Sequence, residues 1–92
     1  MIMHPALKLR HIRAFLDIAA DGSLSSVARR HGISQPALSR TLAEMEDLLA
    51  TPLFRREKRR LVLTEAGALF RRHASLGLQA LEDGVAALRP GG

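Results

Sequence analysis

The 92-residue sequence contains no cysteine, tryptophan or tyrosine, and its only aromatic residues are three phenylalanines. Without cysteine the chain cannot form a disulfide framework, a thiolate metal site or a cysteine nucleophile. Without tryptophan or tyrosine, a stacking platform for single-stranded nucleic acid is not expected. No run approaches the ~18 apolar residues of a membrane span. Residues 1–5 lack the basic start and apolar run of a signal peptide. We therefore expect a cytoplasmic protein.

Catalytic and metal-binding patterns are also missing from the sequence. The four histidines are scattered, and no two lie at ligand spacing on one helix face. The serines lie in no nucleophile elbow, and there is no glycine-rich phosphate loop. We expect neither an enzyme nor a metal site, and no cofactor bound by this chain.

The charge of the chain favours a polyanionic partner. Fourteen Lys and Arg against nine Asp and Glu give a net charge of +5 and a pI near 11.3. Such a surplus suits nucleic acid first and an anionic membrane second. The length of 92 residues suits one small domain, and the hydrophobic content of 47% is enough for it to fold.

Periodicity predicts a mainly helical chain. A first helix over residues 7–20 has an apolar stripe at Leu9, Ile12, Leu16 and Ala19. A short second helix follows the N-cap Ser23 and ends near residue 31 at a glycine. We expect His31 to be partly buried there, and Ile33 to plug the turn that follows.

A third helix begins after a second N-cap serine, and its proline is tolerated in the first turn. Its apolar residues form one stripe: Leu38, Leu42, Met45 and Leu49. Two helices joined by a glycine-containing turn form a helix-turn-helix, whose second helix enters the DNA major groove by its N-terminal residues. The face opposite the stripe carries Pro36, Ser39 and Arg40, and Gln35 lies at the N-terminal edge of the helix. Together with the N-cap Ser34, these are the candidate DNA-reading residues.

The chemistry of this face supports the interpretation. Arginine reads guanine in a bidentate manner, glutamine reads adenine, and serine suits either base. Glu44, Glu46 and Asp47 crowd the second half of the helix. Because carboxylates near phosphate are unfavourable, we expect only the N-terminal half to meet DNA.

A basic hairpin, or wing, is predicted next. Two β-capable runs, residues 53–54 and 61–63, flank a charged segment that looks long for a tight turn. The sequence does not decide the strand register, and therefore does not decide which basic residues face DNA. The candidates for phosphate or minor-groove contact are Arg55, Arg56, Lys58, Arg59 and Arg60.

A long last helix, about residues 65–88, follows the N-cap Thr64. Its apolar spacing is close to a coiled-coil seam, which predicts a homodimer because an uncovered seam would expose a large apolar patch. The first turns should also pack on their own domain. The candidate interface residues are Phe70, Ala74, Leu78, Leu81, Val85 and Leu88. A two-fold dimer should read an inverted repeat.

The sequence resembles the N-terminal domain of LysR-type transcriptional regulators over about residues 7–88. Spaced blocks carry the resemblance: Leu9, Phe15, Gly22-Ser23, Ala28, residues 34–40, Glu46, Leu49, Leu53-Phe54, Arg56 and residues 63–67. It implies a winged helix-turn-helix of three helices and a two-stranded wing at 7–63, and a linker and dimerisation helix at 64–89. It also implies DNA reading by Gln35, Pro36, Ser39 and Arg40, and wing contacts around Arg56. Such regulators usually sense a small-molecule effector in a larger domain that these 92 residues do not contain.

The chain departs from that family pattern at three positions. Val27 replaces a small residue, His31 replaces leucine, and Ala50 replaces the glycine that usually ends the reading helix. Alanine tolerates a left-handed backbone poorly, by roughly 1 kcal/mol. We therefore expect that helix to end differently or to run slightly longer.

Other interpretations remain open at this point. The chain could be a non-specific architectural DNA binder. It could also be a protein-interaction or dimerisation module in which the long helix is the working part. A membrane-surface helix at 65–88 is less favoured, because its cations are sparse. Enzymatic activity is the least favoured class.

Overall fold

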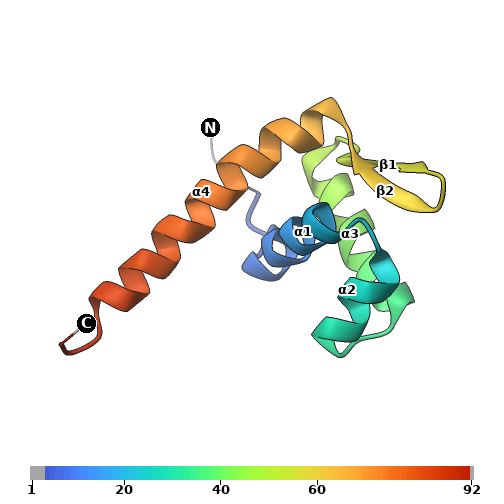
Figure 1. The fold of residues 1–92 in the computed structure, drawn as a ribbon. Coiled ribbons are helices and arrows are strands. Elements are labelled where there is room, and N and C mark those ends of the chain that lie inside the picture. Colours follow the sequence, from blue (N-terminus) through green and yellow to red (C-terminus); the bar gives the residue numbers. More distant parts are fainter. Residues whose placement is uncertain (1–3, 92) are drawn as a thin grey trace.

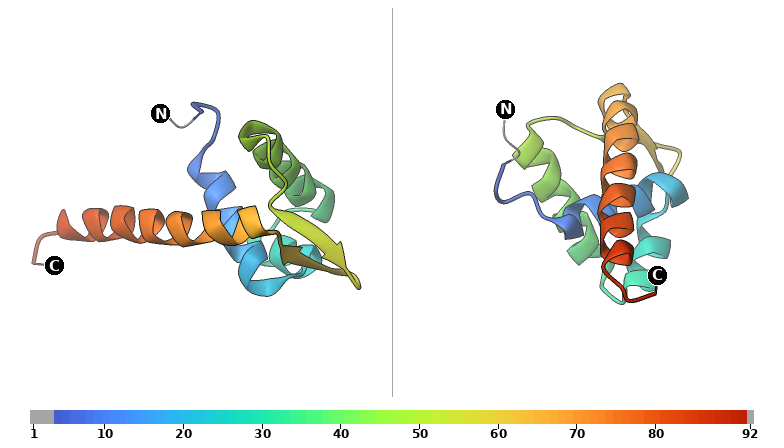
Figure 2. Two further views of the ribbon diagram at one scale, coloured as in Figure 1. Left: turned by 90° about the horizontal axis from the view of Figure 1, so that it is seen from above. Right: turned by 90° about the vertical axis from the view of Figure 1, so that its left-hand side faces the viewer.

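A computed structural model describes residues 4–91, so what the sequence suggested for residues 1–3 and 92 lies outside it. The elements are α1 (Leu9–Asp21), α2 (Leu24–His31), α3 (Gln35–Leu49), β1 (Phe54–Glu57), β2 (Arg60–Leu63) and α4 (Glu65–Ala87). The first three helices form a compact body with the hairpin at one edge, and α4 runs outward from it (Figures 1 and 2). The predicted fold of three helices, a two-stranded wing and a long last helix is confirmed. Within the described residues, no helix combines the length and apolar content needed to cross a bilayer.

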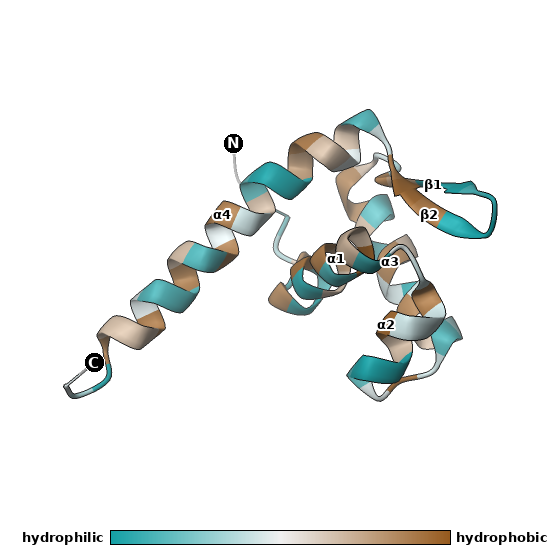
Figure 3. Cartoon of the chain, in the orientation of Figure 1, coloured by the Kyte–Doolittle hydropathy of each residue, from teal (hydrophilic) through white to brown (hydrophobic). Residues whose placement is uncertain are grey.

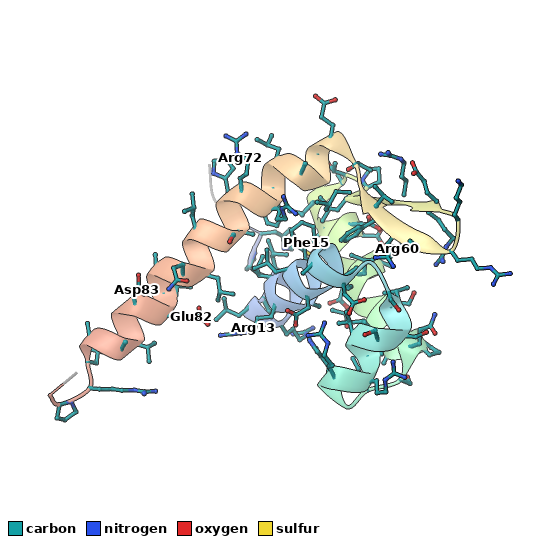
Figure 4. The ribbon with its side chains drawn as sticks, viewed as in Figure 1. Arg13, Phe15, Arg60, Arg72, Glu82 and Asp83 are labelled. Carbon is teal, nitrogen blue, oxygen red and sulfur yellow. The ribbon has the colours of Figure 1, made fainter. Side chains whose placement is uncertain are left out.

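The core is centred on Phe15 of α1, which is fully buried. Its ring lies 5.5 Å from that of Phe54 and 5.4 Å from that of Phe70, both tilted. Figure 4 shows Phe15 between α1 and the start of α4. Such aromatic pairs add to the apolar area that they bury. Three elements, α1, β1 and α4, are therefore joined at one point.

The expected stripe of α3 is confirmed, because Leu38, Leu42 and Met45 are buried and Leu49 is half-buried. The first helix differs from the expectation: it begins at Leu9 rather than at residue 7. Leu9 itself is 50% exposed, because the buried positions of α1 lie on another face, around Phe15 and Ile18.

The turn between α2 and α3 differs from the expectation at Ile33. The side chain of His31 is 29% exposed, and thus partly buried as expected, and its Nε2 lies 2.6 Å from Oδ2 of Asp17. Ile33 is 42% exposed and does not plug the turn. The backbone closes this turn instead: the N–H of Ile33 donates to the carbonyl oxygen of Ala28 at 3.0 Å, while Gly32 is left-handed with φ 69°.

The end of α3 also differs from the expectation. The helix ends at Leu49, and Ala50 adopts the left-handed conformation with φ 54° despite its Cβ. The N–H of Thr51 donates to the carbonyl oxygen of Glu46 at 3.1 Å, which is the long-range bond of a Schellman ending. The carboxylate of Glu46 then accepts the backbone N–H groups of Leu53 and Phe54 at 2.6 and 3.2 Å. These bonds hold the chain beyond Ala50 and offset its backbone strain.

A buried histidine ties α1 to α3. His11 is completely buried, and its Nδ1 accepts the backbone N–H of Lys8 at 2.9 Å. Its Nε2 must therefore carry the hydrogen, which it donates to Oε1 of Glu44 at 2.5 Å. Sequence patterns assign no role to His11, because it lies 33 positions from Glu44.

This tie predicts an acid-sensitive step in stability. The hydrogen bond from His11 lowers the pKa of Glu44 below the usual value of a glutamate carboxyl group. A lowered pKa stabilises the fold above the unfolded-state pKa, and this stabilisation is lost as the pH falls through the folded-state pKa. We expect Glu44→Gln to be less sensitive than the parent to acidification from about pH 6 to pH 3, measured by urea unfolding. Asp47→Asn, which removes an exposed carboxylate from the same helix, is the control. Equal acid sensitivity in Glu44→Gln and the parent would contradict this role.

Candidate nucleic-acid interface

The N-terminal half of α3 presents a polar, exposed face. Ser34 caps the helix, and its Oγ accepts the N–H of Ala37 at 3.2 Å. Because Leu38, Leu42 and Met45 face the core, the opposite side of the helix points outward. The structure leaves all five residues that the sequence indicated exposed, with Ser34 and Gln35 at the N-terminal end of the helix: Ser34, Gln35, Pro36, Ser39 and Arg40.

The charges of α3 are divided along its length. Glu44 binds His11 and Arg10, and Glu46 binds backbone N–H groups of the segment before the wing. Both carboxylates thus bond to the body of the domain. Among the hydrogen bonds and ion pairs found in residues 4–91, none engages the guanidinium of Arg40. The exposed N-terminal half of α3 therefore offers a cation and hydroxyls, together with the positive end of the helix dipole.

The hairpin is tighter than the sequence indicated. Phe54 pairs with Leu63 and Glu57 with Arg60, so both strands extend into the charged run. Only Lys58 and Arg59 form the turn, with φ 48° and 70°. Two positive φ values are typical of a type I′ turn, which matches the twist of the strands. The expected long loop was wrong; the hydrophilic tip and hydrophobic base of the hairpin are visible in Figure 3.

Two of the five wing cations are engaged within the domain. Nε of Arg55 lies 2.5 Å from a carboxylate oxygen of Glu57, and its Nη1 donates to the carbonyl oxygen of Leu63 at 3.2 Å. Arg60 turns back toward the body, as Figure 4 shows, and its Nη2 donates to the carbonyl oxygen of Asp21 at 2.6 Å.

The other three wing cations are Arg56, Lys58 and Arg59. The contacts of the described residues include no hydrogen bond or ion pair from their side chains. The wing is itself fixed to the body, because the N–H of Leu61 donates to the carbonyl oxygen of Gly22 at 3.0 Å. Arg55 and Arg60 therefore stabilise the wing. The other three cations remain available for a partner.

Sequence reasoning missed two residues that shape this surface. Asp21 accepts the N–H of Ser23 at 3.2 Å and the hydroxyl of Ser26 at 2.9 Å, which fixes the start of α2. Ser25 donates from its Oγ to Oε1 of Gln35 at 2.8 Å. An Asp-Gly-Ser stop and cap could have indicated the first, whereas no local pattern indicates the second.

The seam of α4 divides between the chain's own core and its surface. Phe70 is half-buried against Phe15, and Ala74 is buried, so both already pack within this chain. They were expected at the dimer interface, and their own core covers them because the first turns of α4 lie on α1. Leu81, Val85 and Leu88 are 55%, 57% and 84% exposed. Together with half-buried Leu78 and exposed Leu9, the first two of these line a groove between α1 and α4 of about 370 Å³.

Known proteins resemble this chain in sequence. Residues 9–68 match the family model described as "Bacterial regulatory helix-turn-helix protein, lysR family". The chain is 35% identical over 79 residues to the HTH-type transcriptional regulator PcaQ of Agrobacterium fabrum, covering 86% of this chain and 25% of PcaQ. It is 42% identical over 64 residues to the HTH-type transcriptional regulator BudR of Klebsiella aerogenes, covering 70% of this chain and 45% of BudR. The chain thus spans about a quarter of the length of PcaQ.

Solved structures share the fold. BenM_DBD in its complex with benA site 1 DNA superposes with a TM-score of 0.83 at 30% identity, over 88% of this chain and 94% of that one. Full-length CbnR, complexed with its target DNA, gives a TM-score of 0.77 at 29% identity, over 88% of this chain and 28% of CbnR. The arrangement of helices, wing and long last helix is therefore common to all three.

Proposed function

The chain belongs to the lysR family of bacterial regulatory helix-turn-helix proteins, and from this premise we propose that residues 7–63 bind double-stranded DNA sequence-specifically to regulate transcription. One observation carries the proposal: the N-terminal half of α3 exposes Ser39 and an unengaged Arg40, while Glu44 bonds to the body. Relatives described as transcriptional regulators, and similar structures solved with DNA, support it.

We propose that α3 enters the major groove by its N-terminal end. There Arg40 reads guanine, and the hydroxyl of Ser39 donates or accepts a further hydrogen bond. Ser34 and Pro36 approach the DNA backbone. The wing follows the phosphates or the minor groove with Arg56, Lys58 and Arg59. Arg55 bonds within the wing and Arg60 ties the wing to α1 instead.

We further propose that residues 64–89 link two copies into a dimer, through Leu78, Leu81, Val85 and Leu88. A two-fold dimer places two reading helices on successive turns of an inverted repeat. The bacterial cytoplasm, on the nucleoid, is the proposed location. Any small-molecule effector would bind in the part of the relatives' length that this chain does not match.

Selection of bound DNA from a random double-stranded pool, at fixed salt, tests this function. We expect an enriched inverted repeat. Arg40→Ala should bind the selected site about 1–3 kcal/mol more weakly and lose base preference at one position of each half-site. Arg89→Ala, which removes the same charge beyond the end of α4, should keep that preference. Uniform binding of all sequences would indicate an architectural DNA-binding protein. No binding of DNA would contradict the proposal and favour a protein-interaction module.

A further inference from the structure

The first helix of the helix-turn-helix holds a side chain of the second. Ser25 lies in the first turn of α2 and Gln35 is the first residue of α3. The Oγ of Ser25 donates a hydrogen bond to Oε1 of Gln35 at 2.8 Å. Both residues are exposed on the surface. Gln35 is therefore already oriented before any DNA arrives.

The bond determines which end of the Gln35 carboxamide stays free. A carboxamide has one oxygen with two acceptor sites and an NH2 group with two donor hydrogens. The hydroxyl of Ser25 occupies one of these acceptor sites and holds the oxygen on the side of α2. The first backbone N–H groups of α2 carry partial positive charge, which also favours the oxygen end on that side. The NH2 group is consequently the end of Gln35 that this bond leaves free.

This orientation changes the base that Gln35 can read. Bidentate recognition of adenine requires glutamine to donate to N7 and accept from N6, whereas the major-groove edge of guanine presents two acceptors, N7 and O6. We propose that Ser25 is a specificity-determining residue that biases Gln35 toward reading by donation, because it engages the carboxamide oxygen, so that guanine is preferred over adenine. This inference rests on the proposed function, and it assigns a specificity role to the helix that is not inserted in the groove.

The test is a selection from a random double-stranded DNA pool with the 92-residue chain and its variants. Gln35→Ala should lose the preference at one position of the half-site, which locates the base that Gln35 reads. At that position the parent should prefer guanine. Ser25→Ala releases the carboxamide oxygen, so the ratio of adenine to guanine should rise by about fivefold or more, the lower end of what a bidentate pair contributes.

Two further variants keep the comparison specific. Ser25→Thr retains the hydroxyl and should keep the parent's guanine preference. Ser75→Ala removes an exposed serine from α4 and should change no base preference. Circular dichroism of each variant should match the parent, because Ser25 is exposed.

The outcomes separate this inference from the proposed function. If Gln35→Ala abolishes the preference and Ser25→Ala leaves the ratio unchanged, the role of Ser25 is overturned while specific DNA binding stands. A parent preference for adenine at that position, or no effect of Gln35→Ala, would also overturn it. If the parent enriches no sequence at all, the proposed function itself fails.

Discussion

Gly67→Ala is expected to destabilise the domain by on the order of 3 kcal/mol, the upper range for overpacking a well-packed site. Gly67 is buried in the first turn of α4. A Cβ on it would overlap the backbone carbonyl oxygen of Leu53 and lie 3.0 Å from a methyl carbon of Leu63. That carbonyl cannot turn aside freely, because it accepts the N–H of Thr64 at 2.9 Å.

The effect should have the opposite sign at another glycine of the same helix. Alanine is favoured over glycine in a helix interior by about 1 kcal/mol. Nothing lies within 4 Å of a Cβ built on Gly77, so Gly77→Ala should gain roughly that amount. Urea unfolding, at a concentration where the chain is monomeric, measures both variants. Equal stabilities of Gly67→Ala and the parent would show that the junction of β1, β2 and α4 is looser than described.

The two glycines differ in a way that helix propensity does not predict. By helix propensity, Gly67 and Gly77 are equally unfavourable, and only the family resemblance singled out the first. The difference lies in the carbonyl of Leu53, which comes from a segment outside the helix. The helices themselves were predictable, because apolar spacing and the caps Ser23, Ser34 and Thr64 are local signals.

The candidate site was predictable to the same extent. The exposed face of α3 followed from the opposite apolar stripe, so the sequence could place Gln35 and Arg40 on it. It could not find the bonds of Ser25 to Gln35 or of His11 to Glu44, since each joins two helices. The wing turn was missed because Lys58 and Arg59 lack the Asn-Gly signal of a type I′ turn.

The wing tip gives the second large prediction. Lys58 and Arg59 both adopt positive φ, a conformation that costs a residue with a Cβ roughly 1–2 kcal/mol. Replacing them together with Asn and Gly supplies the residues that this turn favours. We therefore expect Lys58→Asn with Arg59→Gly to raise the folding stability, by on the order of 1 kcal/mol. Thermal or urea unfolding measures the change.

The same double variant should weaken DNA binding. It removes two cations that no contact within the described residues engages, and each lost phosphate contact reduces the slope of log affinity against log salt by about 0.9. The slope should thus fall in magnitude by about 2, while the base preference set by α3 stays unchanged. The exchange Lys58→Arg with Arg59→Lys keeps both charge and backbone cost, so it should alter neither property. A double variant with unchanged salt dependence would show that the tip does not contact DNA. Opposite changes in stability and affinity would mean that the tip keeps a strained backbone because lysine and arginine are needed there for their charge.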